Sequence, residues 1–172
     1  MKTHKFNYNL PEHLIAQYPL KNRTDSRLLV ALESIQHKVF SEIGSHLRSG
    51  DLLVLNKTSV IPARLFGKKS TGGKIEILLE RFLSDCKTLS QIRSSRAPKE
   101  GTELIFTYDD EKFIATVKGR KDNFFILDWL VNPQSLFLNH GQIPLPPYMN
   151  RAPEKIDEER YETIYADPSK KE

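Results

Sequence analysis

Six short stretches with strand character follow one another between Ala63 and Leu127, and this series constrains the fold more than any other feature of the sequence. The expected strands are 63–67, 74–82, 88–92, 103–106, 113–118 and 123–127. Turn-forming residues separate them at Gly72-Gly73, Pro98, Gly101, Asp109-Asp110 and Gly119. Short strands that alternate with turn residues predict a β barrel or a β sandwich.

The segments on both sides of this series combine short helices with apolar runs. We expect helices over 9–18, 41–47, 132–141 and 157–165, and strands over 27–32 and 51–56. Asn132 and Asp157 are the predicted N-caps of the last two helices. The run 51–56 is apolar without alternation, which is typical of a strand buried on both faces. These elements are too few and too short to bury themselves, so the sequence predicts an incomplete domain wrapped around a complete β domain.

The composition excludes several classes of protein. Hydrophobic residues make up 38% of the chain, and no run of about 18 apolar residues predicts a transmembrane helix. The first ten residues lack the apolar core of a signal peptide. The single cysteine, Cys86, excludes an internal disulfide and fits a reducing cytoplasm. The five histidines are scattered without partners at ligand spacing, so we expect no metal site. Because no apolar run is long enough to span a bilayer, we also expect no membrane partner.

Positive charge is concentrated in the middle of the chain. The net charge is +4, and residues 66–100 hold eight lysines and arginines against four acids. Residues 153–172 reverse the balance, with seven acids against four bases. A local excess of cations fits a polyanionic partner such as nucleic acid. The alternative is an ordinary solvated strand surface.

Polar residues follow the apolar run 51–56. Asn56 and Thr58 lie at its carboxyl end, and Arg64 lies in the next expected strand. Ligands in α/β folds commonly sit beyond the carboxyl ends of strands, and Asn and Thr side chains can hydrogen-bond a base edge or a ribose hydroxyl. A plain polar turn is the alternative interpretation.

Two further stretches carry candidate phosphate contacts. Lys74 follows Gly72-Gly73, where backbone N–H groups can approach a phosphate, although a plain hairpin turn explains the same pattern. Arg93, Arg96 and Lys99 lie with two serines in an expected strand-to-strand loop, where cations and hydroxyls suit phosphate. Aromatic residues of the β series offer stacking surface for bases or, alternatively, fill the core: Phe106, Tyr108, Phe113, Phe124 and Phe125.

Several blocks, taken together, resemble the S-adenosylmethionine:tRNA ribosyltransferase-isomerases of queuosine biosynthesis. Two of them are Val60-Ile61-Pro62-Ala63-Arg64-Leu65 and Ile143-Pro144-Leu145-Pro146-Pro147-Tyr148. The others, in order along the chain, are 10–12, 14–16, 19, 27–29, 50–54, 71–81, 92–93, 97–99, 101, 141, 151 and 161–166. The matches cover nearly the whole chain in sequence order.

The resemblance implies both an activity and a fold. The family transfers the ribosyl part of S-adenosylmethionine, its co-substrate, to 7-aminomethyl-7-deazaguanine at the wobble position of the tRNA anticodon. The products are epoxyqueuosine in tRNA, adenine and methionine. The implied fold is α+β and mainly β, with an inserted β barrel (63–131) flanked by an incomplete α/β barrel-like domain (1–62 and 132–172). Tyr148 and Arg151 join the candidate substrate-binding or RNA-binding residues because they lie in matched blocks.

The chain departs from the family pattern in two places. The family usually has an acidic residue or Asn, then Thr, then a basic residue after the Asn of its signature, whereas this chain has Lys57-Thr58-Ser59. A block resembling Gly-Ala-Val-Ala-Ala-Pro-Thr-Ala-Gly-Leu-His-Phe is also expected soon after Ala166, and the sequence stops at Glu172. We therefore expect the chain alone to be inactive and a separately encoded C-terminal half to be a candidate partner.

The catalytic base is not assigned. Among the acids of the matched blocks, Asp51, Glu76 and Glu80 are candidates, but charge on a strand surface is the better explanation for each. Two other interpretations stay open: a non-enzymatic RNA-binding barrel, which needs no S-adenosylmethionine, and a gene remnant that folds poorly.

Overall fold

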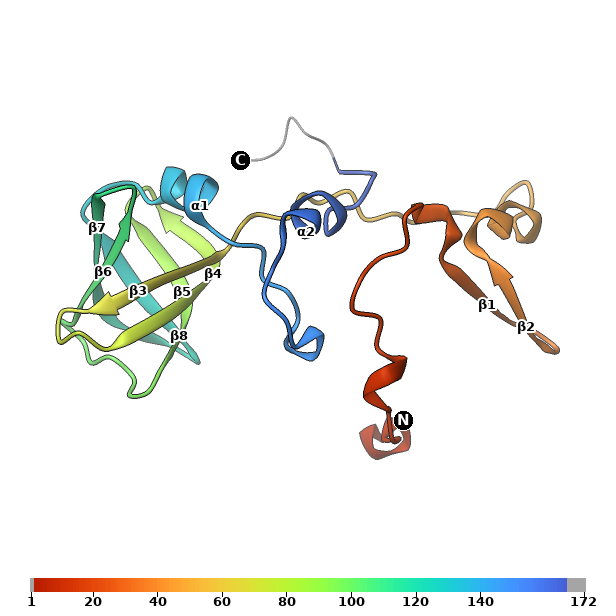
Figure 1. Cartoon of the computed structure of the whole chain (residues 1–172), viewed down its shortest axis with the longest axis horizontal. Coiled ribbons are helices and arrows are strands. Elements are labelled where there is room, and N and C mark those ends of the chain that lie inside the picture. The colour runs from red at the N-terminus through yellow and green to blue at the C-terminus, as the bar shows by residue number, and fades with distance from the viewer. Residues whose placement is uncertain (1, 167–172) are drawn as a thin grey trace. The chain divides into compact units, whose positions relative to one another are not determined.

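The computed structural model describes residues 2–166 (Figure 1). The chain divides into two compact units. The first, here the hairpin unit, comprises residues up to 56 together with 146–151. The second, here the barrel unit, comprises residues 57–145 and the segment from 152 onward. No helix in the described part of the chain is long and apolar enough to cross a membrane.

Six antiparallel strands of the barrel unit close into a barrel in the order β3-β4-β5-β8-β7-β6. The strands are β3 (Arg64–Lys69), β4 (Lys74–Ser84), β5 (Lys87–Ser94), β6 (Glu103–Tyr108), β7 (Glu111–Lys121) and β8 (Phe124–Trp129). All six stretches expected from the sequence form strands, and the mainly β class with a barrel is confirmed. The division at 62 and 131 stays a prediction.

Alternation of side chains builds the barrel core. Along β8, Phe125, Leu127 and Trp129 are buried while the residues between them are only half-buried. The indole N–H of Trp129 donates a 2.9 Å hydrogen bond to the buried hydroxyl of Thr88, so the polar atoms of this pair are satisfied inside the core. Phe106 is fully buried. Phe106 and Phe125 therefore belong to the core, as the second of the two interpretations of these aromatic residues predicted.

The barrel closes at a short seam between β3 and β6. Only Lys68 with Ile105 and Lys69 with Leu104 pair there. Beyond these pairs, the hydroxyl of Tyr108 donates to the carbonyl of Phe66 and accepts from its N–H, both at 3.0 Å. The phenol of Tyr108 thus satisfies the backbone N–H and carbonyl of Phe66, which have no partner residue on β6. Burial raises the pKa of Tyr108 above its ordinary value, and the hydrogen bond to Phe66 opposes that rise.

Helix α1 (Gln134–His140) packs on the barrel through its buried residues Leu136 and Phe137. Pro133, and not the expected Asn132, is its N-cap, because the carbonyl of Pro133 accepts the first helical N–H; the Asn132 side chain still accepts from the N–H of Gln134 at 2.9 Å. The expected N-cap of the last helix is also wrong. Helix α2 (Lys155–Arg160) begins one turn earlier, and Asp157 accepts from the N–H of Glu154 at 2.8 Å.

Gly141 follows α1 where two backbones meet. A Cβ on this glycine would lie 1.9 Å from the carbonyl oxygen of Pro62, so no larger residue fits without a shift. The next residue, Gln142, exchanges backbone hydrogen bonds of 3.1 and 2.8 Å with Arg64. The chain therefore enters and leaves the barrel at one place.

The hairpin unit is built from short elements. Strands β1 (Arg27–Ala31) and β2 (Ile35–Val39) form an antiparallel two-stranded sheet, and β1 confirms the strand expected over 27–32. The remaining elements are 3-10 turns: η1 (Thr3–Phe6), η2 (Glu12–Leu14), η3 (Arg23–Asp25), η4 (Phe40–His46) and η5 (Pro147–Met149). The helices expected over 9–18 and 41–47 are thus only 3-10 turns.

The strand expected over 51–56 does not form in the described structure. Leu52 is 89% exposed and Val54 is 83% exposed. A strand needs a neighbour to satisfy its backbone and bury its side chains, and none of the described strands pairs with this run. The expectation failed because apolar character alone does not supply that neighbour.

Candidate nucleic-acid interface

Three loops gather at one end of the barrel (Figure 1). Strands β3, β5 and β7 end there, and β4, β6 and β8 begin there, because all neighbours are antiparallel. The loops are the β3–β4 hairpin, the β5–β6 loop and the β7–β8 hairpin. The opposite end carries the β4–β5 and β6–β7 turns and leads into α1.

Lysines and arginines cluster at the three-loop end, which we call the basic end. Its eight cations are Lys68, Lys69, Lys74, Arg93, Arg96, Lys99, Arg120 and Lys121. The described acids in the same loops and strand ends are Glu76, which pairs in register with Arg93, and Glu100, Glu103 and Asp122. The opposite end holds five acids, Asp85, Asp109, Asp110, Glu111 and Asp128, against Lys87 and Lys112, and Lys118 lies 3.6 Å from the carboxylate of Asp128. Such a separation of charge along the barrel favours the approach of a polyanion at the basic end.

A lysine fastens two of the loops to each other. The ammonium of Lys69 donates a 2.9 Å hydrogen bond to the backbone carbonyl of Arg96, and the hydroxyl of Ser94 donates to the same oxygen at 2.7 Å. The N–H of Ser70 donates to the carbonyl of Glu103 at 2.9 Å. The β3–β4 hairpin and the β5–β6 loop are therefore held in one arrangement.

The β5–β6 loop is also fixed to β7. Gly101, at φ +83°, donates to the carbonyl of Val117 at 2.8 Å, and Val117 donates back to Thr102 at 3.0 Å. Pro98 is buried, while Arg96 and Lys99 are exposed. A fixed backbone that presents exposed cations lowers the ordering cost of binding.

Arg64 has a different environment from the basic-end cations. Its Nε lies 3.1 Å from a carboxylate oxygen of Glu76, and its terminal nitrogen donates to the carbonyl of Leu145 at 3.4 Å. The side chains of Arg64 and Glu76 are only 20% and 25% exposed. Arg64 thus fastens the chain that returns from α1 to the barrel wall.

The remaining candidates lie outside the barrel strands. Asn56 and Thr58 are exposed in an irregular segment. Tyr148 and Arg151 belong to the hairpin unit, where the guanidinium of Arg151 donates to the carbonyl of Gln17 at 3.0 Å and lies 4.5 Å from the ring centre of Tyr18. Of the candidates, all of which lie in the described part of the chain, the structure therefore brings together Lys74, Arg93, Arg96 and Lys99.

Four members of the basic end were not predicted as site residues: Lys68 and Lys69, which the sequence showed only as part of the basic stretch 66–100, and Arg120 and Lys121. The available signal was the order of the strands. Strands that follow one another in the chain run in opposite directions in this barrel, so alternate loops share an end and the turns near 70, 97 and 122 belong together. Charge counted along the chain hides this grouping.

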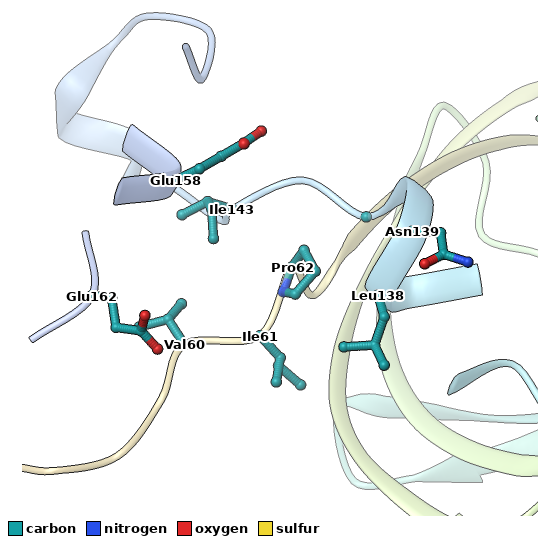
Figure 2. A pocket seen from close by; sticks show the side chains of 9 residues that line it. Val60, Ile61, Pro62, Leu138, Asn139, Ile143, Glu158 and Glu162 are labelled. Carbon is teal, nitrogen blue, oxygen red and sulfur yellow. The ribbon is translucent and has the colours of Figure 1, made fainter. Parts of the chain in front are cut away.

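A hollow of about 320 Å³ lies in the barrel unit where Val60, Ile61 and Pro62 leave the irregular segment. In Figure 2, Pro62 lies between Leu138 of α1 and Ile143. Glu158 and Glu162 line the hollow from α2 and the residues after it. Its apolar wall is continuous with the crossing of Pro62 and Gly141, so the hollow marks where the barrel joins its flanking segments.

Comparison with known proteins gives consistent matches. The family described as queuosine biosynthesis protein matches residues 3–171. The S-adenosylmethionine:tRNA ribosyltransferase-isomerase of Coxiella burnetii (strain Dugway 5J108-111) is 45% identical over 171 residues, covering 96% of this chain and 49% of the relative. The Vesicomyosocius okutanii protein of the same name is 49% identical over 170 residues, covering 96% and 48%.

A solved structure is also similar. The crystal structure of an S-adenosylmethionine tRNA ribosyltransferase from Thermotoga maritima has 35% sequence identity and a TM-score of 0.41, covering 91% of this chain and 54% of that one. The chain spans about half the length of the curated relatives it matches.

Proposed function

The chain belongs to the queuosine biosynthesis protein family, and from this membership we propose that it is the N-terminal half of an S-adenosylmethionine:tRNA ribosyltransferase-isomerase. The proposed reaction moves the ribosyl part of S-adenosylmethionine to 7-aminomethyl-7-deazaguanine in tRNA, giving epoxyqueuosine, adenine and methionine. The observation that carries the proposal is identity of 45–49% to enzymes of that name over 96% of this chain. The proposed location is the cytoplasm, where tRNA is available.

Within this function, we assign tRNA binding to the basic end of the barrel. Each nucleotide of tRNA carries a phosphate, and cations that neutralise phosphates dominate affinity for nucleic acid. Arg93 lies at the end of β5 and not in the loop where the sequence placed it, whereas Arg96 and Lys99 lie on the loop that follows, which Lys69 and Val117 hold in place. The acidic opposite end repels the same phosphates, which favours one orientation of the RNA on the barrel.

We propose that catalysis uses residues in addition to the described residues of this chain. A base must remove a proton close to the sulfonium-bearing carbon, and other groups must bind adenine and methionine as they leave. Glu76, one of the acids considered, is paired with Arg64. We propose that the chain by itself binds tRNA but does not turn over S-adenosylmethionine, and that residues equivalent to the other half of its relatives complete the site.

A chimera tests this proposal. This chain is joined to the second half of the Coxiella burnetii relative, and adenine release from S-adenosylmethionine is measured with precursor-bearing tRNA. We expect release by the chimera and by the intact relative, and none by the 172-residue chain alone. A chimera that folds and binds tRNA but releases no adenine would contradict the assignment. Adenine release by the chain alone would contradict the proposal that residues equivalent to the other half of its relatives complete the active site.

A non-enzymatic RNA-binding barrel is the second candidate. The observation that favours it is that the barrel closes its own core and completes its basic end within this chain. It predicts that the chimera binds tRNA without adenine release, and that S-adenosylmethionine leaves the affinity for tRNA unchanged.

A further inference from the structure

We propose that the outer wall of the barrel, beside the basic end, binds one unpaired nucleobase of RNA, stacked on Phe66, with the neighbouring phosphate on Lys68 and Lys74. This inference rests on the proposed RNA binding at the basic end and adds to it a contact to a base. Phosphate contacts fix position, whereas a stacked base requires an unpaired nucleotide. The occupant is therefore a single-stranded or looped RNA segment.

The first observation is the placement of Phe66. Its neighbours on β3, Leu65 and Gly67, face the barrel interior, and Phe66 faces outward with 46% of its surface exposed. The other exposed phenyl ring of the barrel strands, Phe82, packs edge-on against Phe137 at 6.0 Å. An outward ring beside cations is the arrangement with which proteins bind single-stranded nucleic acid.

The second observation is a pair of like charges. Lys68 and Lys74 lie directly opposite each other on β3 and β4, and both are exposed. Like charges at such a cross-strand position destabilise a sheet. An anion placed between them removes the repulsion. Lys68 lies two residues along the same strand face from Phe66, at about 7 Å, which matches a base on the ring and its phosphate on the lysines.

The third observation is the hollow that these residues line. A depression of about 580 Å³ includes Phe66, Lys68, Lys74, Ile105 and Thr107. Its volume is in the usual range for small-ligand sites, about 300–1,000 Å³. The depression follows the seam where β3 and β6 pair at only two positions. The Tyr108 hydroxyl satisfies the backbone of Phe66, so the wall stays closed without a further strand pair.

The nearest acid does not oppose an anion here. Glu76 is the cross-strand neighbour of Phe66, and its carboxylate lies 3.1 Å from Nε of Arg64. The negative charge is therefore offset by a fixed cation. Charge complementarity thus favours an anionic ligand over a purely apolar peptide, and the outward ring of Phe66 favours an anion that carries a base.

The test compares RNA with and without a base, using the full chain. A short single-stranded RNA oligonucleotide and its abasic counterpart are titrated against the wild-type chain and Phe66→Leu. We expect wild type to prefer the oligonucleotide with bases about tenfold, since stacking contributes about 1–3 kcal/mol per base. In Phe66→Leu the preference should fall to near unity, and Phe66→Tyr should retain it. Phe82→Leu is the matched control, with the preference of wild type.

The lysines have a separate readout. Lys68→Ala and Lys74→Ala should each flatten the salt dependence of binding by roughly 0.7 in log–log slope for single strands, while the preference for bases persists. Phe66→Leu should leave this slope unchanged. Thermal unfolding of each variant identifies any that fails to fold, and if Phe66→Leu does, Phe66→Val, which suits a strand and has no ring, carries the comparison.

Three outcomes overturn the inference in distinguishable ways. If wild type binds RNA through the basic end but does not distinguish the abasic oligonucleotide, the stacking site is wrong and the proposed function stands. If wild type binds no RNA, the stacking site and the proposed RNA binding at the basic end are both wrong. If Phe66→Leu binds RNA as wild type does but impairs folding of the chimera, the ring belongs to a protein interface.

Discussion

The barrel unit and the hairpin unit contain similar apolar residues and use them differently. The described buried hydrophobic residues all lie between Ala63 and Leu145, in the barrel unit. In the hairpin unit, Leu32, Leu52 and Val54 are 79%, 89% and 83% exposed. The barrel brings each apolar face a partner from a distant strand, whereas β1 and β2 have only each other. Burial therefore depends on non-local partners more than on local hydrophobicity.

The largest expected effect is the difference in local stability between the units. Amide hydrogens of β5 and β8 should exchange only through global unfolding, whereas those of β1 and β2 should exchange freely, because an isolated hairpin is marginally stable. We expect the opening free energies of the two units to differ by about 5 kcal/mol, which is the lower end of the range for the free energy of unfolding of a whole domain. Hydrogen exchange with mass spectrometry measures this, and limited proteolysis should cleave the flanks before residues 64–131. Equal protection would show that the hairpin unit has an unrecognised core.

Two side-chain substitutions, one in each unit, compare the contributions of single residues to stability. Phe106→Ala removes a fully buried ring and should lower the free energy of unfolding by about 3–5 kcal/mol. Leu52→Ala removes an 89% exposed side chain and should change it by less than about 0.5 kcal/mol. Urea denaturation measures both. A cost for Leu52→Ala close to that of Phe106→Ala would mean that Leu52 is buried in solution.

Charge variants compare the two units in RNA binding. Alanine at Arg93, Arg96 and Lys99 should weaken tRNA binding and flatten its salt dependence by about 0.9 for each phosphate that is no longer neutralised, without changing preference among RNA sequences. The matched control replaces three exposed cations of the hairpin unit: Lys5, Arg27 and Arg48. We expect the control to bind as wild type does. Unchanged affinity and slope in the first variant would exclude the β5–β6 loop as an RNA-binding element.

The smallest effect tests the seam that makes the barrel closed. Tyr108→Phe removes both hydrogen bonds to Phe66 and should cost about 1 kcal/mol. Burial raises the pKa of Tyr108 in the folded state. The contribution of the protonated phenol to the free energy of unfolding is therefore complete below the unfolded pKa of about 10. This contribution is lost as the pH rises through the higher pKa of the folded state. Tyr108→Phe should lack this alkaline loss, and denaturation curves across the alkaline range test it.

The sequence predicted the barrel strands because each carries its own local signals. The alternation in Lys74-Ile75-Glu76-Ile77 and the turn at Gly72-Gly73 both depend on neighbouring residues. The strand order, the β3–β6 seam and the role of Tyr108 depend on residues distant in sequence, which no local pattern reports. The error at 51–56 has the same cause, since the pattern of a buried strand does not identify its partner.

The candidate site was predicted in part for a related reason. Arg93, Arg96 and Lys99 stand out because they are close in sequence, and Lys74 because it follows two glycines. Lys68, Arg120 and Phe66 become candidates only when β3 and β7 are placed in the barrel. Arg64 shows the converse, because a single arginine in an apolar strand gives no sign that Glu76 and the Leu145 carbonyl engage it.

The paired backbones of Arg64 and Gln142 bear on how such a protein is assembled in evolution. A domain whose entry and exit strands are hydrogen-bonded side by side can be gained or lost in one genetic event, because a short turn spans the remaining gap. The barrel therefore has the geometry of a unit that can be inserted into one surface loop of another domain, and Gly141 against the Pro62 carbonyl is the junction that such an insertion must preserve.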